Sequence, residues 1–188
     1  KEIIVGLLDK IYHRFLSQYI EGAIMYRLKL NYYSADIRLT DNNKFIFIMP
    51  DKNDFDKLSY LYQNNHEKLN VVKNRLNSEN YLCFSYMDNK NKVIVYSRWV
   101  CKKEYYSDVL RKKLKFKENQ VLTLDSWTHP NYRGLGLHRN MNIMMLKWIK
   151  QNTDVTEVFM LIKFFIPHIT KIACQIGYKP IKRYFHLK

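Results

Sequence analysis

Residues that form turns, linkers and cross-links are scarce in this sequence. Its 188 residues include only five glycines, four prolines and three cysteines. With no low-complexity block and no internal repeat, this composition argues against flexible linkers and repeat architectures and favours one globular domain. Cys83, Cys101 and Cys174 lie far apart and are odd in number, which argues against a disulfide framework and against a zinc site. We therefore expect no bound metal and a reduced, cytoplasmic environment.

Long apolar runs are missing as well. No stretch is long enough to span a bilayer, and no secretory signal opens the chain, so we expect no transmembrane segment. The chain begins at Lys1 without a methionine, which would fit a tag or a missing upstream segment.

Acidic residues are scarce in the last third of the chain. The net charge is +15, and only Asp154 and Glu157 are acidic after Asp125, against ten lysines and arginines. Such a positive field favours polyanionic partners: a phosphorylated cofactor, a nucleotide-linked substrate, nucleic acid or an anionic membrane. The abundance of Lys, Asn, Ile and Tyr also fits an AT-rich genome, which would explain much of the excess in the first half.

The first half of the chain predicts helices around a hairpin. Apolar residues recur every three or four positions over residues 2–28 and predict a helix, packed on the domain or forming a dimer arm. Short β-rich runs at 35–40 and 44–49 predict a hairpin. Residues 51–77 look helical, with Asp51 or Asn53 as the N-cap and a break near "QNNHEK".

The second half alternates strand and helix patterns. A hairpin is predicted from 81–87 and 93–99, followed by a charged, partly helical excursion over 101–120. The remaining elements are a strand at 121–127, a helix at 140–151, a strand at 157–162, a helix at 167–176 and a closing strand at 178–187. Hairpins mixed with strand–helix units predict a mixed sheet flanked by helices.

The most informative stretch is "NYRGLGLHRN", residues 131–140, between a predicted strand and a predicted helix. A helix N-terminus presents unpaired N–H groups and the positive end of the helix dipole, so phosphate binds there readily. Gly134 and Gly136 would let phosphate approach the backbone closely, and Arg133 and Arg139 add positive charge. The sequence therefore predicts a pyrophosphate site at this turn.

Other phosphate-binding motifs fit this turn less well. A dinucleotide-binding loop would need a third glycine where Arg139 stands, and the Gly-Lys-Ser/Thr of a P-loop is absent. The plainer alternative is a turn that starts a helix in any α/β domain.

In its context, "HPNYRGLGL" resembles the acetyl-CoA-binding motif of the GNAT superfamily of N-acetyltransferases. That motif, Arg/Gln-x-x-Gly-x-Gly/Ala, falls on Asn131, Gly134 and Gly136, and Asn131 departs from its first position. "KFIFIMPDKNDFDKLSYLY", "YLCFSYMDNKNKVIVYSRWV" and "IACQIGYKP" resemble the family's first strand and helix, its next two strands and its late helix. The resemblance covers residues 44–188, and residues 1–43 would be a helical and hairpin extension packed on that domain.

The resemblance implies a mixed α+β fold with a mostly antiparallel sheet, splayed between its fourth and fifth strands, flanked by helices and preceded by an extra N-terminal helix. Here those two strands would be 121–127 and 157–162, with acetyl-CoA, or another acyl-CoA, held between them. His138 would contact phosphate or cap the helix, and Trp127 would wall the pantetheine tunnel or pack in the core. The implied cofactor-binding residues are Ser126, Trp127, Thr128, Arg133, Gly134, Leu135, Gly136, Leu137, His138 and Arg139.

The catalytic groups are less well marked. Family members often carry a tyrosine late in the last helix as the acid for the thiolate, but that position is Ala173, and Ile166 stands where an Asn often begins the helix. Asp125, at the end of the fourth strand, is a candidate base for the amine, or else a turn aspartate. His168, near the start of the last helix, is the second candidate, or else a partly exposed histidine.

The resemblance implies an acetyl-CoA-dependent N-acetyltransferase that moves the acetyl group directly to a primary amine. "LDSWTHPNYRGLGL" most resembles members found with bacterial surface-polysaccharide genes, so an amino sugar, nucleotide-linked in keeping with the positive field, is the favoured acceptor. Three alternatives stay open: acetylation of aminoacyl-tRNA or a ribosomal protein, a CoA-binding module without catalysis, and transfer of a longer acyl chain. Nucleic acid stays open as a partner because of the net charge, and a dimer through the N-terminal helix also stays open.

Overall fold

The computed structural model describes residues 20–33, 44–62, 65–164 and 166–187. In this part of the chain, seven strands form one sheet in the order β2-β3-β4-β7-β8-β1-β9, and β5 and β6 form a separate hairpin. Neighbouring strands of the large sheet are antiparallel, except that β7 and β8 are parallel. The strands are β1 (Ile20–Lys29), β2 (Phe45–Ile48), β3 (Tyr81–Asp88), β4 (Ile94–Cys101), β5 (Glu104–Ser107), β6 (Lys112–Lys115), β7 (Gln120–Thr128), β8 (Glu157–Lys163) and β9 (Lys179–Leu187).

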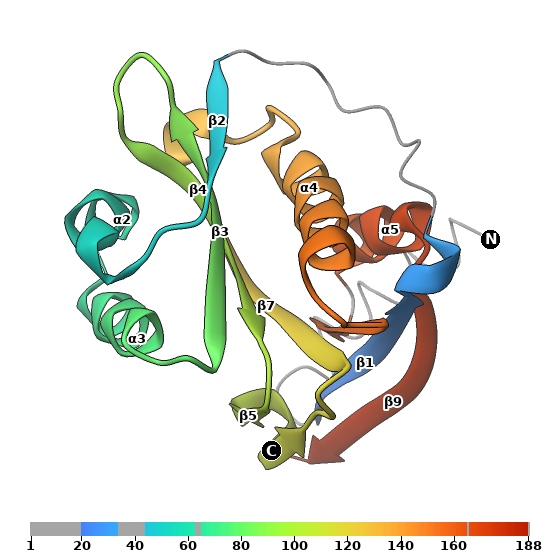
Figure 1. Cartoon of the computed structure of the whole chain (residues 1–188). Coiled ribbons are helices and arrows are strands. Elements are labelled where there is room, and N and C mark those ends of the chain that lie inside the picture. Colours follow the sequence, from blue (N-terminus) through green and yellow to red (C-terminus); the bar gives the residue numbers. More distant parts are fainter. Residues whose placement is uncertain (1–19, 34–43, 63–64, 165, 188) are drawn as a thin grey trace.

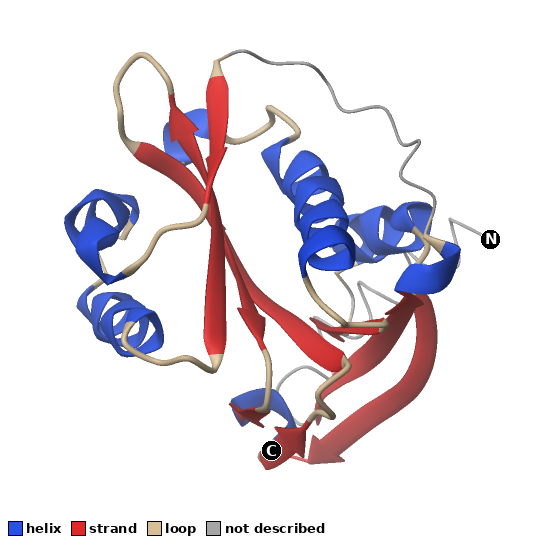
Figure 2. Ribbon diagram, in the orientation of Figure 1, coloured by secondary structure: helices blue, strands red, loops and turns tan. Residues whose placement is uncertain are grey.

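Helices cover both faces of the sheet (Figures 1 and 2). On one face, α2 (Phe55–Leu61) and α3 (His66–Leu76) pack against β3 and β4. On the other face, α4 (Leu137–Asn152) and α5 (Pro167–Ile176) enclose the larger apolar cluster with the sheet. None of the helices in the described ranges is both long and apolar enough to cross a membrane.

Polar residues and one glycine mark the helix ends, and Asp51, one of the two predicted N-caps, caps the 3₁₀ turn before α2. The Asp51 carboxylate accepts a hydrogen bond from Asn53 N at 2.7 Å and begins the turn that leads into α2. Asn65 caps α3 by accepting from Lys68 N at 3.0 Å, so the predicted break between the two helices is confirmed. Gly177, with φ 109°, ends α5, and Tyr178 N donates to Ala173 O at 3.0 Å.

The predicted mixed α+β class and the strands of the second half are confirmed. The charged excursion differs from the prediction, because it is mainly the β5–β6 hairpin with one 3₁₀ turn at Asp108–Leu110. The partly buried Tyr105 and Leu114 pack against Met25 and Leu122 of the large sheet. This contact, which is remote in sequence, favours the hairpin over the local helical pattern.

The helix predicted over residues 2–28 is wrong for residues 20–28, which belong to β1. Residues 1–19 lie outside the described residues. β1 pairs with both β8 and β9 and is therefore an interior strand of the sheet. Tyr26 and Leu28 of β1 join the cluster under α4 and α5, and Met25 is buried on the other face. Because β1 has buried residues on both faces, its apolar residues need not alternate strictly and can imitate a helical period. Residues 20–29 are thus part of the main sheet, not of an extension that packs on it.

The hairpin predicted in the first fifty residues is described only in part. Its second strand is confirmed as β2, which pairs with β3. Its first strand, residues 35–40, lies outside the described residues.

Candidate functional site

The two central strands β7 and β8 separate soon after they begin. They pair only over Gln120–Thr123 and Glu157–Met160, whereas β7 continues to Thr128 paired with β4 alone. In sheet order these are the fourth and fifth strands, so the predicted splay is confirmed. Asp125 has φ 32° and forms a bulge where the β4–β7 register shifts. Beyond Thr123, the edge of β7 that faces β8 has no strand partner.

A cavity of about 340 Å³ lies beside this free edge, at the N-terminal end of α4. Two residues of β7, the turn before α4 and the first residues of α5 line it. The lining residues are Ser126, Thr128, Tyr132, Arg133, Gly134, Leu135, Gly136, Leu137, His138, Arg139, His168, Ile169 and Ile172. The structure thus brings together nine of the ten predicted cofactor-binding residues and one of the two predicted catalytic residues.

The turn before α4 exposes its backbone. Gly134 and Gly136 have φ values of 78° and 72°, the left-handed region that glycine adopts without strain. A Cβ atom at either position would meet no atom within 4 Å, so the backbone faces open space. Gly136 is the N-cap of α4, no side chain caps the helix, and no acidic residue lies in its first turn. The first N–H groups of α4 are therefore available to an anion.

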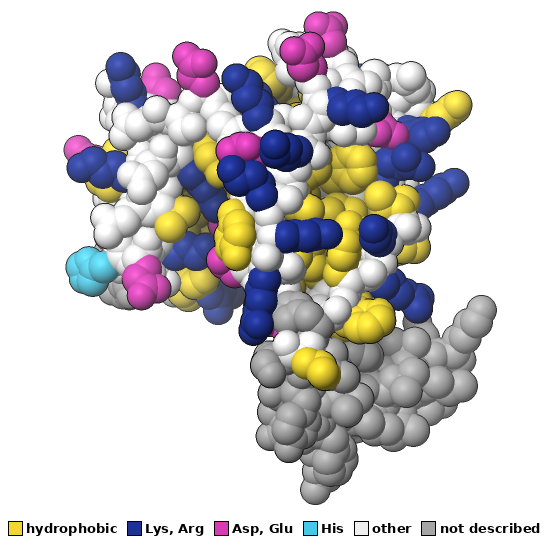
Figure 3. All heavy atoms as spheres, turned by 90° about the horizontal axis from the view of Figure 1, so that it is seen from below, with side chains coloured by type: hydrophobic (Ala, Val, Ile, Leu, Met, Phe, Trp, Pro, Cys, Tyr) yellow, Lys and Arg dark blue, Asp and Glu magenta, His cyan; other side chains and the backbone are white. Residues whose placement is uncertain are grey.

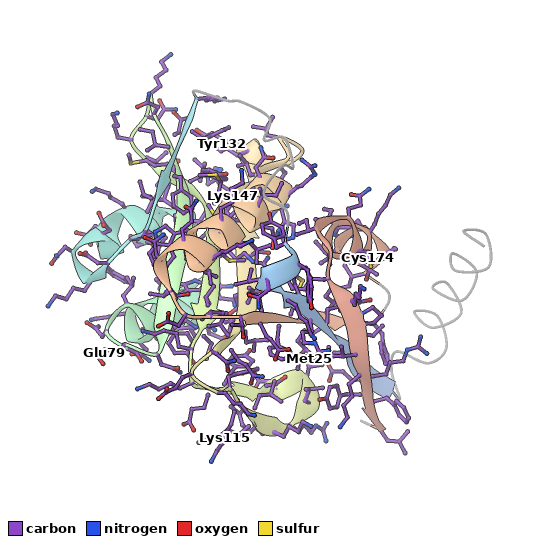
Figure 4. All side chains as sticks on the ribbon, turned by 45° about the vertical axis from the view of Figure 1, so that its right-hand side comes forward. Met25, Glu79, Lys115, Tyr132, Lys147 and Cys174 are labelled. Carbon is purple, nitrogen blue, oxygen red and sulfur yellow. The ribbon has the colours of Figure 1, made fainter. Side chains whose placement is uncertain are left out.

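Contacts with neighbouring loops hold this turn in place. The Tyr132 hydroxyl donates to Asp88 Oδ2 at 3.0 Å, and His129 N donates to Val95 O at 2.9 Å. The His129 ring stacks on Tyr60 with ring centroids 5.5 Å apart. Figure 4 shows Tyr132 beside the N-terminal end of α4. These contacts fix the position of the turn relative to β3 and β4.

His138 forms part of the cavity wall and is neutral at physiological pH. Its Nδ1 lies 3.0 Å from the Tyr96 hydroxyl. Burial, followed by the positive charges of Arg98 and His168, lowers the pKa of His138 to about 3. His138 is therefore a hydrogen-bonding group of the wall, not a cation that holds phosphate.

Two predicted site residues, Asp125 and Trp127, project from the opposite face of the sheet. Trp127 packs in the α2–α3 cluster, 6.1 Å from the Tyr62 ring, so it does not wall the cavity. The Asp125 carboxylate pairs with Arg75 at 2.7 Å and Lys68 at 3.4 Å, both from α3. Burial acts to raise the pKa of Asp125, but these two cations outweigh it and hold the pKa below its usual value. A paired carboxylate with a lowered pKa is a weak base, which argues against the base role predicted for Asp125.

α5 presents one titratable side chain to the cavity, that of His168. It is exposed in the first turn of α5 and lines the cavity with Ile169 and Ile172. Ala173 is buried, with 1% of its surface exposed, so the position at which the family often carries a tyrosine points into the core. Cys174 is exposed on α5 and does not line the cavity.

Several residues around the cavity were missed from the sequence. Tyr132, Ile169 and Ile172 line it, but nothing in their local pattern marks them. Arg98 lies beneath it, opposite Ser126 in the β4–β7 register. Its position inside the apolar run "VIVYSRWV" could have indicated a functional role, because burying a charged side chain in a strand costs free energy unless another group compensates for it.

Comparison with known proteins identifies the fold. No protein-family model and no curated protein sequence matches this chain. Among solved structures, a tandem GNAT protein from the clavulanic acid biosynthesis pathway is 11% identical, with a TM-score of 0.61 and coverage of 89% of this chain and 54% of its own. A glucosamine N-acetyltransferase region of a fungal multi-domain β-N-acetylglucosaminidase is 13% identical, with a TM-score of 0.67 and coverage of 94% and 22%.

An aminoglycoside acetyltransferase, AAC(6')-Iy, solved with a bisubstrate analogue of CoA and acetylneamine, is 12% identical, with a TM-score of 0.56 and coverage of 74% and 94%. This chain spans about half the length of the tandem protein and about a fifth of the fungal one. These likenesses show that the described part of the chain has the GNAT fold.

Proposed function

We propose that this protein is an acyl-CoA-dependent N-acyltransferase that acetylates a primary amine. One observation carries the proposal: a single cavity joins the free edge of β7 to the open, acid-free N-terminus of α4. The pyrophosphate of CoA would bind the N–H groups between Arg133 and Arg139, where both glycines leave the backbone accessible. The pantetheine arm would lie along Ser126 and Thr128, whose strand has no partner on that edge.

The transfer needs few groups from the protein. The amine nitrogen forms a bond to the acyl carbon, the carbon–sulfur bond breaks, the ammonium loses one proton and the departing thiolate gains one. His168 is the titratable side chain of the cavity that could accept the amine proton, directly or through water.

The favoured acceptor is an amino sugar that carries negative charge, such as a nucleotide-linked one. An apolar surface with Phe159, Leu161 and Tyr184 lies on the sheet face opposite α4 and α5. Cations border it: Lys112 and Lys182 lie 4.2 Å and 5.3 Å from the centroid of the Tyr184 ring. Figure 3 shows hydrophobic side chains among Lys and Arg on this end of the molecule. Positive charge disfavours polycationic acceptors such as aminoglycosides and favours anionic ones.

The similar structures support an amino-sugar acceptor in a limited way. One of them is a glucosamine N-acetyltransferase region, and another is bound to a CoA–acetylneamine analogue. An association with surface-polysaccharide synthesis, suggested by the sequence around the turn, would supply such an acceptor.

Two measurements test the proposal in order. Calorimetric titration with CoA, acetyl-CoA and a longer acyl-CoA should give saturable binding to one site, and the ranking of the ligands would report acyl length. A screen for free-thiol release should then respond to nucleotide-linked amino sugars more strongly than to aminoglycosides. If no thioester binds, the chain is not an acyltransferase.

A second function, CoA binding without catalysis, is favoured by one observation. The buried Ala173 leaves α5 without the tyrosine acid, and Asp125 is held in ion pairs. Tight CoA binding together with no thiol release across amines, aminoacyl-tRNA and ribosomal proteins would support this second function.

A further inference from the structure

Arg98 is a buried cation without an acidic partner. Only 4% of its surface is exposed, yet no carboxylate of the described residues pairs with it. Its guanidinium donates a hydrogen bond from Nη2 to Thr123 Oγ1 at 2.9 Å and also interacts with the Tyr96 hydroxyl, whereas its buried Nε has no hydrogen-bond partner. Burying a charge in this way is costly unless something compensates for it.

The position of Arg98 relates it to the cavity. It lies directly opposite Ser126, which lines the cavity, and cross-strand partners share one face of the sheet. Its hydrogen-bond partner Thr123 is the last residue of β7 that pairs with β8. Arg98 does not line the cavity itself, but it lies at the inner end of the splay, on the face of the sheet that carries the cavity.

The charge of Arg98 acts on the groups that surround the cavity. It is one of the causes that lower the pKa of His138, after burial, and it opposes the effect of burial on the pKa of Tyr96 and of Tyr178. The Tyr96 hydroxyl contacts His138, which lines the cavity. A positive potential at the inner end is consistent with all three effects, and it would be strong because little water screens it.

Other buried polar groups on the α4–α5 side of the sheet also lack hydrogen-bond partners. The described residues contain five buried side-chain nitrogen or oxygen atoms without a hydrogen-bond partner. Besides Arg98 Nε, three of them lie between the sheet and α4 or in that apolar cluster: Tyr33 Oη, Asn142 Oδ1 and Tyr178 Oη. Unsatisfied groups gathered on one side of the sheet point to a functional rather than a structural requirement there.

We propose that Arg98 stabilises the thiolate that leaves the acyl donor, in place of an acid on α5. This inference rests on the proposed function. A fixed positive charge at the place where negative charge develops lowers the barrier without any proton transfer. The thiolate can then take its proton from solvent after the carbon–sulfur bond has broken. The absence of a tyrosine at Ala173 is thereby explained.

The test measures the thiol pKa of bound CoA, which requires no acceptor. The ultraviolet absorbance of the thiolate is followed against pH in the protein–CoA complex, with the desulfo-CoA complex as the blank. A Cys174→Ser background removes the exposed thiol of the protein. Burial raises the pKa of Cys83 to about 12 and also raises the pKa of Cys101, and Cys83→Ser and Cys101→Ser variants without CoA provide the blanks for these two thiols. We expect the bound thiol to titrate at least about one pH unit lower than free CoA, a tenfold change in its ionisation constant.

Three variants identify the cause. Arg98→Met removes the charge at similar volume and should return the thiol pKa to its value in free CoA, while Arg98→Lys should retain most of the lowering. The double variant Arg75→Met/Asp125→Asn removes the paired charges on the opposite face and should leave the thiol pKa unchanged. The lysine variant keeps the experiment decisive if Arg98→Met does not fold.

The outcomes separate the inference from the function on which it rests. If CoA does not bind, both fail. If CoA binds but its thiol titrates as in free solution, or if Arg98→Met retains the lowering, only the role of Arg98 is overturned. In the catalysed reaction, Arg98→Met should lower kcat at least tenfold with little change in the Kd for the donor, as expected for a group that acts on the leaving thiolate.

Discussion

One arginine is buried on each face of the sheet, and the two arginines differ in whether a carboxylate pairs with them. On the α2–α3 face, Arg75 has a carboxylate 2.7 Å away in Asp125 and lies over the rings of Tyr81 and Trp99. On the α4–α5 face, the hydrogen-bond partners of Arg98 are the neutral Thr123 and Tyr96, and no acid among the described residues pairs with it. The charge of Arg75 is compensated by Asp125, whereas we propose that the charge of Arg98 acts on a bound ligand.

The same contrast extends to the rest of each face. Asp125 and Trp127 point toward α2 and α3, where they join an ion-pair group and an apolar cluster. Ser126 and Thr128, their neighbours on the same strand, line the cavity. Alternation along β7 thus separates the residues that pack under α2 and α3 from the residues that line the cavity, and the bulge at Asp125 sets which side chain faces which side. Substitutions on one face should therefore change stability, and those on the other should change ligand binding.

The largest effect is expected at the turn on the α4–α5 face. Gly136→Asp places a carboxylate where the phosphates of CoA would lie, and we expect affinity for CoA to fall at least about 100-fold, roughly 2.7 kcal/mol. Calorimetry measures the loss. Gly136→Asn is the matched control, because asparagine tolerates a positive φ equally well but adds no charge. Equal losses in both variants would mean that the turn requires glycine for its backbone shape alone.

Substitutions on the α2–α3 face should change the free energy of unfolding. Arg75→Met removes the main partner of Asp125 and should lower the free energy of unfolding by roughly 1–2 kcal/mol, below the 3–5 kcal/mol of a fully buried pair because Asp125 is partly solvated. Denaturant unfolding measures the change, and Lys68→Met, which removes the more exposed partner, should cost less. Both variants should bind CoA with an affinity within about twofold of the wild type. This result would show that the α2–α3 face contributes to stability and not to CoA binding.

Sequence patterns predicted the local part of this architecture well. The turn at Gly134 and Gly136, the strand before it and the helix after it were all identifiable because capping and backbone freedom act over a few residues. The position of β1 in the sheet could not be predicted, because its apolar pattern suits a helix equally well. Only its pairing with β8 and β9 makes this segment a strand.

The site could likewise be predicted where it depends on local sequence and not where it depends on contacts between strands. Nine residues predicted to bind the donor line one cavity. Which way Asp125 and Trp127 point depends on a bulge that no local signal marks, and Arg98 reaches the site only through cross-strand register.

The ion pair of Asp125 also predicts a modest pH dependence. Because the pKa of Asp125 is lowered in the folded protein, the pair contributes stability above the unfolded value of about 3.9 and loses it as pH falls through the folded value. The wild type should therefore be more stable than Asp125→Asn at pH 6, and the difference should shrink below about pH 4. Parallel denaturant series at both pH values measure this, and a constant difference would show that the carboxylate contributes by packing alone.

The smallest effect on the free energy of unfolding is expected for Arg98→Met, and this variant is the most informative about the role of the buried charge. Arg98→Met removes a buried charge that no carboxylate of the described residues pairs with, so the free energy of unfolding without ligand should stay within about 0.5 kcal/mol or rise by about 1 kcal/mol. A structural arginine behaves in the opposite way, as expected for Arg75→Met in the same denaturant titration. A loss of several kcal/mol for Arg98→Met would mean that its bond to Thr123 holds the two strands together, and the contrast between the faces would disappear. If unfolding is unchanged while the thiol of bound CoA returns to its ordinary pKa, then Arg98 is kept for the ligand and not for the fold.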